Sequence, residues 1–297
     1  MDEMNETAWL AERFEANRSH LRSVAYRMLG SLSDADDAVQ EAWIRLSRAE
    51  ARDIDNLRTW LTTVVGRVCL NMLRSRKTRR DESLETQIPD PIVSPVEGID
   101  PEREALLGES IGLALVVVLG ALAPAERVAF VLHDIFAVPF DEIAPIVGRT
   151  PTAARQLASR ARRRVQGAPV PDVDLDGQWA VVDAFLAAAR AGAFDRLLAV
   201  LDPDVVLRSD GGVKRPELNS LVRGAQAIAE QALTYRQFAE TSTRILVNGI
   251  PGGVAWAPDG SPYAILALTV KGARIVAIDI LADPERLGKL DLTEVAG

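Results

Sequence analysis

The chain is poor in the residues that form disulfides and metal sites. Its 297 residues include one cysteine and two histidines. A single cysteine, Cys69, excludes an internal disulfide, and its place in an apolar helical pattern indicates a small core residue rather than a reactive thiol. His20 and His133 do not combine with that distant cysteine into the spacing of a zinc site. We therefore expect neither a structural metal nor a cofactor.

Long apolar runs are also missing. The sequence has no run of about eighteen or more apolar residues, the length that a membrane-spanning helix needs. Its most apolar segment, residues 111–122, is shorter and contains Gly112 and Gly120. The N-terminal sequence MDEMNETAWLAERFE is acidic and lacks the basic-then-apolar order of a signal peptide. These features predict a cytoplasmic protein that has no membrane contact.

The chain as a whole carries no excess of positive charge. Its 34 Lys and Arg residues face 42 Asp and Glu residues, so the formal net charge is −8. A protein that coats nucleic acid indiscriminately would be basic overall. The basic residues are instead concentrated in residues 59–80 and 149–164, each with six basic residues and no acid. This pattern favours a protein that contacts DNA only within a larger assembly or under control.

Residues 123–165 have the pattern of a helix-turn-helix. Gly148 marks the turn, Thr150 can cap the second helix, and Pro151 suits its first turn. The apolar stripe of that helix is predicted to be Ala154, Leu157, Ala161 and Val165. A face rich in Arg, Gln and Ser suits the major groove of DNA. The alternative is an ordinary helical hairpin with a solvated basic face.

Three further helices are expected in the N-terminal part of the chain. The first ends at Gly30, and the second begins at Ser33 as N-cap, with Asp36 three residues on. The third covers residues 56–75. On the second helix, spacing alone favours a plain solvated face over a docking face for a basic partner. On the third helix, it favours a core position for Trp60 over a position that stacks on an unpaired base.

Two segments read as linkers, and these set the expected domain limits. Residues 81–101 are acidic and contain four prolines, and residues 168–177 again combine proline with acids. We therefore expect domains at 1–80, 102–167 and 178–297.

The C-terminal third has a different pattern. Helices are predicted at 179–190, 194–201 and 223–238, and strands at 244–248, 253–257, 263–270 and 274–281, with a hairpin turn at Lys271-Gly272. Helices on a curved antiparallel sheet form a cone with an inner cavity. Asp183, Asp210 and Asp279 are candidate catalytic carboxylates, but both histidines lie before residue 134, so no His–carboxylate pair can form here.

Three segments carry a resemblance to a known family. They are AYRMLGSLSDADDAVQEAWIRL (25–46), RTWLTTVVGRVCLNMLR (58–74) and LAPAERVAFVLHDIF with GRTPTAARQLASRARRR (122–136 and 148–164). They resemble regions 2 and 4 of the extracytoplasmic-function sigma factors of bacterial RNA polymerase. Pro145, inside the first helix of the helix-turn-helix, departs from that pattern and is expected to shorten or bend the helix.

The resemblance implies a role for each helix. The 34–46 helix would bind the clamp helices of the largest polymerase subunit through Asp34, Asp37, Glu41 and Trp43. The 58–80 helix would melt and read the −10 promoter element through Trp60, Arg67, Asn71, Arg74, Arg76 and Lys77. The helix after Thr150 would read the −35 element through Thr152, Arg155, Gln156, Ser159, Arg160 and Arg163. The 81–101 linker would run through the polymerase cleft.

The C-terminal third resembles the SnoaL-like domains. One sigma group carries such a domain in place of a separate anti-sigma protein, and its short motifs have counterparts at 87–91 (QIPDP), 209–214 (SDGGVK) and 282–287 (ADPERL). Gln87 replaces a tryptophan and Val213 a glycine of that group. The implied regulatory residues are Asp210, Gly211, Gly212, Lys214, Asp283 and Pro284. A simple turn at 210–212 and a strand end at Asp283-Pro284 remain alternatives.

The sequence thus predicts a multidomain protein: two all-α domains, the second with a helix-turn-helix, followed by an α+β cone-shaped domain. The predicted function is that of a sigma factor whose C-terminal domain modulates its activity in cis, with core RNA polymerase and promoter DNA as partners and a cavity that could take a small-molecule ligand. The alternatives are a ligand-responsive DNA-binding regulator that acts without polymerase, and an enzyme domain tethered to a DNA-binding module. Catalysis is not expected.

Overall fold

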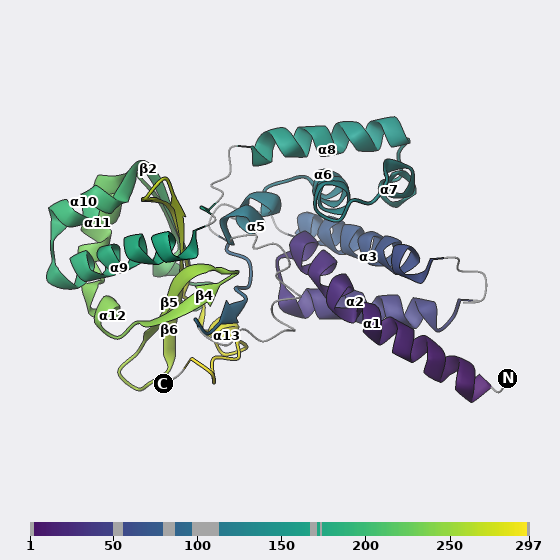
Figure 1. The fold of residues 1–297 in the computed structure, drawn as a ribbon, viewed down its shortest axis with the longest axis horizontal. Helices are drawn as coiled ribbons and strands as arrows, with labels where there is room; N and C mark the ends of the chain where they lie inside the picture. Colours follow the sequence, from purple (N-terminus) through teal and green to yellow (C-terminus); the bar gives the residue numbers. More distant parts are fainter. Residues whose placement is uncertain are drawn as a thin grey trace. The chain divides into compact units, whose positions relative to one another are not determined.

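The computed structural model describes residues 3–49, 56–79, 87–96, 113–166, 171–172 and 174–295. They fall into two compact units (Figure 1). The first unit holds the described residues up to 79 and from 118 to 166. The second unit holds residues 87–96, 113–117 and those from 171 onward. The described part of the 81–101 linker therefore belongs to the second unit.

The N-terminal part of the first unit consists of three helices. They are α1 (Glu3–Leu29), α2 (Leu32–Leu46) and α3 (Leu57–Arg79). Gly30 ends α1 with a φ of +68°, as predicted, because glycine adopts this left-handed conformation without strain. The predicted cap of α2 was wrong by two residues. Ser31, not Ser33, is the N-cap, and its Oγ accepts a hydrogen bond from the Asp34 amide at 3.4 Å.

The second half of this unit consists of helices and one π-helical turn. They are α5 (Leu113–Gly120, which begins in the second unit), α6 (Pro124–Phe130), a π-helical turn (Val131–Ile135), α7 (Phe140–Val147) and α8 (Pro151–Val165). Pro145 cannot donate a backbone hydrogen bond, and α7 ends two residues after it. Gly148 with a φ of +67° and the Thr150 cap confirm the predicted turn.

The buried stripe of α8 differs slightly from the prediction. Ala154, Ala158 and Ala161 are buried, whereas Leu157 and Val165 are half-buried. The helix is therefore rotated by about one residue from the expected orientation. Small alanines on the buried side let α8 lie close to α6, and the basic face stays outward.

Within this unit, α3 packs against α6 and α7. A Cβ on Gly66 would lie 3.3 Å from Leu132 and 3.5 Å from Ile146. Arg127, buried at this junction, donates from Nε to the Arg27 carbonyl at 3.3 Å, and burial lowers its pKa to about 10. Burial likewise raises the pKa of the Cys69 thiol to about 12, which confirms a core residue rather than a reactive thiol.

The second unit is built on a seven-stranded sheet in the order β1-β4-β5-β6-β7-β2-β3. The strands are β1 (Val93–Ser94), β2 (Leu201–Asp210), β3 (Ser220–Arg223), β4 (Thr243–Val247), β5 (Ile250–Trp256), β6 (Pro262–Lys271) and β7 (Arg274–Leu281). The predicted strands from 244 onward are confirmed, and β1, β2 and β3 were not predicted. The helices are α9 (Leu175–Ala191), α10 (Phe194–Val200), α11 (Ala225–Thr234), α12 (Arg236–Glu240) and α13 (Pro284–Leu287), with a 3₁₀ turn at Pro216–Leu218.

The two faces of this sheet are covered by different parts of the chain. Helices α9, α10 and α11 pack on one face, the inner face, around Val182, Leu197 and Ile228. The opposite, outer face is covered by Ile88 and Val93 of the linker, by Leu113 of α5, and by the C-terminal residues Leu287, Leu292 and Val295. The sheet with its helices forms the α+β cone that was expected after the helical unit. Its outer face is closed by the chain itself.

Candidate nucleic-acid interface and linker-binding site

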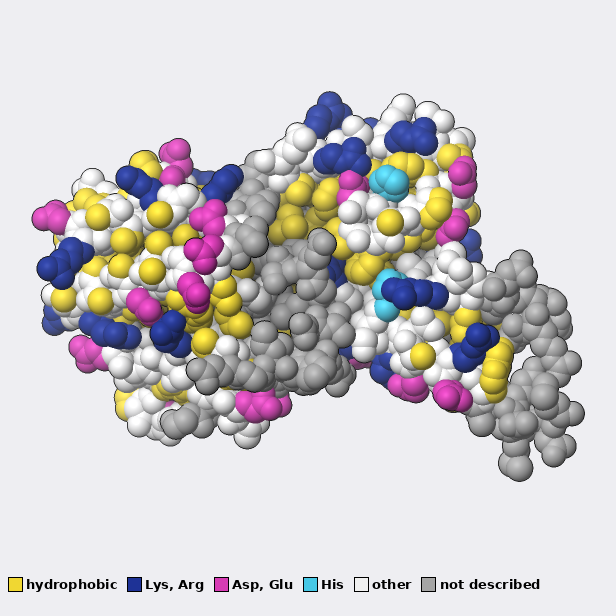
Figure 2. All heavy atoms as spheres, viewed as in Figure 1, with side chains coloured by type: hydrophobic (Ala, Val, Ile, Leu, Met, Phe, Trp, Pro, Cys, Tyr) yellow, Lys and Arg dark blue, Asp and Glu magenta, His cyan; other side chains and the backbone are white. Residues whose placement is uncertain are grey.

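The arginines of α8 divide into two groups. Figure 2 shows basic side chains gathered over this helix at the top of the view. Arg160 and Arg164 both donate to the Glu126 carboxylate, at 3.0 and 2.9 Å, and Arg162 donates from Nε to Asp134 at 2.8 Å. These three fix α8 against the preceding helices. Arg160, a predicted DNA contact, therefore already has an acidic partner.

The other predicted residues of α8 face outward. Thr152, Arg155, Gln156 and Arg163 are exposed, and Ser159 is half-buried. The Arg155 guanidinium lies 5.2 Å from the ring centre of Phe140 in α7. This contact orients the Arg155 side chain. Arg155 lies in the N-terminal part of α8, and the N-terminal residues of a recognition helix usually contact base edges. No ion pair engages Arg163 within the described residues.

The predicted residues of α3 show the same mixture. Arg67, Asn71 and Arg74 are exposed along one side of the helix, and Trp60 is half-buried. Arg76 instead forms an ion pair with Asp34 of α2 and donates to the Leu29 carbonyl at 3.1 Å. Arg76 and Asp34, predicted for different partners, thus contact each other. Lys77 lies in α3, but its side chain is outside the described residues.

On α2, the remaining predicted residues lie at or near the surface. Asp37 is exposed, and Glu41 accepts from Arg45 at 2.9 Å one turn along the helix. Trp43 is half-buried, and its ring centre lies 5.1 Å from that of Phe14 in α1. This surface combines acidic side chains with one partly exposed aromatic, which suits a basic partner.

The second unit contains a polar network that binds the linker. We call Asp210 and Arg286 the linker dock, and they bind Ile88 and Asp90 of the linker. The Asp210 carboxylate accepts from the Ile88 amide at 3.0 Å and from Arg286 Nη1 at 2.8 Å. Arg286 also donates from Nε to Asp90 at 2.8 Å and from Nη2 to the Ile88 carbonyl at 2.6 Å. One guanidinium therefore joins three segments that are far apart in sequence.

Backbone pairing extends this contact along the linker. Val93 and Ser94 form β1, which pairs antiparallel with β4 at the edge of the sheet. The Ile92 amide donates to Asn248 Oδ1 at 3.0 Å, and the Asn248 amide donates to the Ile92 carbonyl at 2.8 Å. Adding a strand to a sheet edge is a common mode of peptide recognition. The pairing of β1 with β4 holds one end of the described linker segment, and the linker dock holds the other end.

The predicted regulatory residues surround the linker dock. The Gly212 amide donates to Asp210 at 3.1 Å, and a Cβ on Gly212 would overlap the Asp283 carboxylate. Asp283 caps α13 by accepting from the Glu285 amide at 2.9 Å, and Pro284 begins that helix. The turn at 210–212 and the strand end at Asp283-Pro284, which the sequence left open as alternatives, are thus both present. Lys214 forms an exposed ion pair with Glu285 at 2.9 Å.

Several residues of this contact were not singled out from the sequence. Arg286 lies inside the quoted 282–287 segment, and Ile88 and Asp90 lie inside 87–91, but no role was assigned to them. Asn248 precedes Gly249, and this Asn-Gly pair is a standard hairpin signal that could have located the β4–β5 turn. Both residues have positive φ values, +52° and +78°.

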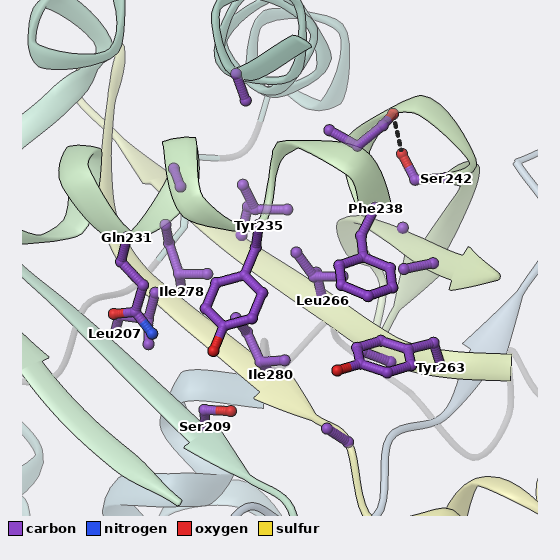
Figure 3. Close-up of a pocket in the computed structure, with 18 of the residues that line it drawn as sticks. Leu207, Ser209, Gln231, Tyr235, Phe238, Ser242, Tyr263, Leu266, Ile278 and Ile280 are labelled. Carbon is purple, nitrogen blue, oxygen red and sulfur yellow. Dashed lines mark hydrogen bonds between the residues drawn. The ribbon is translucent and has the colours of Figure 1, made fainter. Parts of the chain in front are cut away.

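The three candidate catalytic carboxylates lie apart from the cavity of this unit. Asp183 is exposed and faces Arg244 at 3.6 Å. Asp279 is buried and pairs with Arg208 at 3.1 Å, and burial raises the pKa of its carboxyl group. Asp210 belongs to the linker dock. None of them lines the cavity that lies between the inner face of the sheet and helices α9, α11 and α12 (Figure 3).

Metal and membrane sites can be assessed only for the residues that the structure describes. Within those ranges, no three His, Cys, Asp or Glu side chains come together as metal ligands. None of the helices there is both long enough and apolar enough to cross a membrane.

Comparison with known proteins is consistent with this geometry. Residues 13–79 match the family Sigma-70 region 2, and residues 113–165 match Sigma-70, region 4. The ECF RNA polymerase sigma factor SigJ of Mycobacterium tuberculosis is 39% identical over 95% of this chain and 94% of its own length. The probable sigma factor SigI of the same species is 35% identical over 93% and 94%. The crystal structure of SigJ superposes with a TM-score of 0.80, covering 95% of this chain and 99% of that one.

Proposed function

The chain belongs to the extracytoplasmic-function sigma factors of RNA polymerase, and we propose that its C-terminal unit regulates it in cis by binding its own linker. A sigma factor binds core polymerase in the cytoplasm and directs initiation at specific promoters. The linker between regions 2 and 4 cannot occupy the linker dock and the polymerase cleft at the same time. Release from the dock is therefore a step toward the active state.

The exposed side chains suggest which helix contacts the polymerase and which helices contact the promoter. We assign polymerase binding to the α2 surface formed by Asp34, Asp37, Glu41 and Trp43. We assign the −10 element to α3, through Trp60, Arg67, Asn71, Arg74, Arg76 and Lys77. We assign the −35 element to α8, chiefly through Thr152, Arg155, Gln156 and Arg163, with Ser159 and Arg160 at the edge of that face. The Asp34–Arg76 ion pair opens when either residue takes its external partner.

The observation that carries the regulatory proposal is the buried position of the linker. Ile88, Ile92 and Val93 are at most 6% exposed, and the Asp210 carboxylate accepts the Ile88 amide. When the linker leaves, the buried Asp210 carboxylate loses one donor and Arg286 loses two acceptors, which is costly for buried polar groups, so the linker stabilises the dock. We assign the implied regulatory residues Gly211, Gly212, Asp283 and Pro284 to the support of Asp210 and α13 rather than to DNA contact. Lys214 forms only an exposed ion pair with Glu285 among the described residues, and such a pair contributes little.

Transcription in vitro tests this proposal. The full chain, Asp90→Ala and Arg286→Ala would be compared with core polymerase on a promoter that the full chain uses. Both variants should increase the transcript several-fold, since they free the linker. Glu285→Ala, which changes an exposed neighbour of Arg286, is the matched control and should behave as the parent. Equal output from all four proteins would overturn regulation through the linker dock but leave the sigma activity intact.

The relatives do not favour the alternative of a regulator that acts without polymerase. For the tethered enzyme, the positions of Asp183, Asp210 and Asp279 outside the cavity support our proposal that the C-terminal unit is a binding module rather than a catalyst. We further propose that the cavity takes a small-molecule ligand.

A further inference from the structure

We infer that this cavity binds an uncharged compound of one or two rings bearing a hydroxyl or carbonyl group, and that its occupancy strengthens linker binding. The second part rests on the proposed regulatory function, and the first part does not. Figure 3 shows the cavity between the sheet and the helices that cover its inner face.

The size of the cavity limits the ligand. Its volume is about 180 Å³. An engineered apolar cavity of about 150 Å³ holds benzene, and sites for drug-sized ligands have volumes of about 300–1,000 Å³. A compound of one or two rings therefore fits within the cavity.

The charge of the walls excludes most ions. Leu, Ile, Ala and aromatic side chains form most of the lining, and Glu217 is its only charged residue among those that the structure describes. Glu217 itself is exposed, so it lies toward solvent rather than deep inside. Among the described lining residues an anion would meet no cationic side chain, and burying it unpaired would be costly. The preferred ligand is therefore neutral.

Polar groups at defined positions select a hydrogen-bonding ligand. Ser209 of β2 and Ser220 of β3 are directly opposite each other, and both line the cavity. The Ser220 hydroxyl is buried and has no hydrogen-bond partner within the described residues. In Figure 3 the Tyr235 ring reaches into the cavity from the helical side, with its hydroxyl toward Ser209. A ligand hydroxyl or carbonyl would satisfy the unpaired serine.

An aromatic wall favours a flat ligand. The rings of Phe238 and Tyr263 are stacked, with centres 4.0 Å apart and an interplanar angle of 9°. Both line the cavity. Ring compounds gain from contact with such a surface beyond the area that they bury.

Two residues that line the cavity are directly connected to Asp210 of the linker dock. Ser209 faces the cavity, and its neighbour Asp210 binds the linker on the other face of the strand. The Ala282 amide donates to the Asp210 carbonyl at 2.7 Å, and Ala282 lines the cavity. Arg215 donates to the carbonyls of Tyr263 and Ala282, both at 3.1 Å. A ligand that orders Ser209 and Tyr263 thus also orders the strand end that carries Asp210.

Binding can be tested with 2-naphthol, naphthalene and 2-naphthoate, using the full chain and fluorescence titration. We expect 2-naphthol to bind at least about tenfold more tightly than 2-naphthoate. Ser220→Ala should weaken 2-naphthol about fivefold, the effect of one net hydrogen bond, and leave naphthalene unchanged. Ser261→Ala, in an exposed turn, is the matched control. Absence of saturable binding, or equal affinity for the neutral and anionic probes, would overturn the binding site.

Hydrogen exchange tests the coupling. Saturating 2-naphthol should slow exchange of the Ile88 amide several-fold and leave the Gly272 amide, which donates to Asp172 in an exposed turn, unchanged. Binding without any change at Ile88 would overturn the coupling and leave the site. Neither result depends on whether Asp90→Ala changes transcription, so failure here is distinguishable from failure of the proposed function.

Discussion

The two units use charged side chains in opposite ways. In the helical unit, Arg155 and Arg163 of α8 are exposed, and the acids around them serve to hold the helix. In the sheet unit, Asp210 is buried and, with Arg286, binds another part of the same chain. Exposed charges contribute little to folding and are available to partners, whereas a buried charge is costly once its partner is lost. Substitution of the exposed arginines of α8 should therefore change binding, and substitution of Arg286 should change stability.

Removal of Arg286 should have the largest effect on stability. Arg286→Ala removes the only charged partner of the buried Asp210 carboxylate among the described residues and leaves it with the Ile88 and Gly212 amides, so we expect a loss of about 3 kcal/mol in the unfolding free energy of the sheet unit. Urea denaturation measures it. Glu285→Ala should leave the transition unchanged, because Glu285 is 63% exposed. If Asp210→Asn combined with Arg286→Met is no more stable than Arg286→Ala alone, the unpaired carboxylate is not the cause.

A smaller effect is expected from the partly buried His20 in the helical unit. Burial, followed by the charges of Arg58 and Arg27, lowers its pKa from 6.5 to about 4. The unfolded state therefore takes up a proton first as the pH falls. The contribution of His20 to the unfolding free energy is fully present above pH 6.5 and is lost between about pH 6.5 and 4. We expect this loss to be about 2 kcal/mol after allowance for the partial exposure of the side chain.

Parallel unfolding measurements on the parent and His20→Gln from pH 7.5 to 4 test this prediction. The difference between the two curves isolates the histidine from the acids that titrate in the same range. It should grow as the pH falls below 6.5. A constant difference would mean that the folded state protonates His20 as readily as the unfolded state does.

Local sequence signals predicted the helical unit better than the sheet unit. Gly148, Thr150 and Pro151 act within a few residues of themselves, so the turn and the start of α8 could be located directly. The choice between Leu157 and Ala158 as the buried position depends on where α6 lies, which spacing alone does not define. Ser31 and Ser33 are equally good caps by type, and only the backbone geometry distinguishes them.

The linker dock illustrates what local patterns cannot supply. Arg286 binds the Ile88 carbonyl across 198 positions of sequence, and no periodicity relates them. The resemblance to a sigma group with a fused domain pointed to the right segments but not to their contacts. Strand β2 was missed because Asp202, Pro203 and Asp204 interrupt its alternation, and the register shifts between Leu201 and Val206. Strand β1 has only two residues, so it carries no recognisable pattern.

On the exposed side of the comparison, Arg155→Ala should weaken binding of the holoenzyme to promoter DNA about tenfold, the cost of one lost base contact. Its unfolding free energy should fall by no more than about 0.5–1 kcal/mol, the value of the exposed cation–π contact with Phe140. Arg196→Ala is the charge-matched control, because Arg196 is an exposed residue of α10 in the sheet unit. Fluorescence anisotropy at two salt concentrations distinguishes the mechanisms. An unchanged salt dependence indicates a base contact, and a salt slope reduced by about one indicates that Arg155 contacts a phosphate instead.

The smallest effect concerns Gly66, where α3 meets the π-helical turn and α7. Gly66→Ala should raise stability slightly, by about 0.5 kcal/mol, because alanine favours the helix by up to about 1 kcal/mol and its Cβ meets only the flexible ends of Leu132 and Ile146. Gly66→Leu has no such space, so it should destabilise by about 1–3 kcal/mol and separate the two helical layers. Thermal unfolding measures both variants. If alanine raises and leucine lowers the stability, close packing rather than charge holds regions 2 and 4 together in the helical unit. If alanine also lowers the stability, the side chains of Leu132 and Ile146 cannot move.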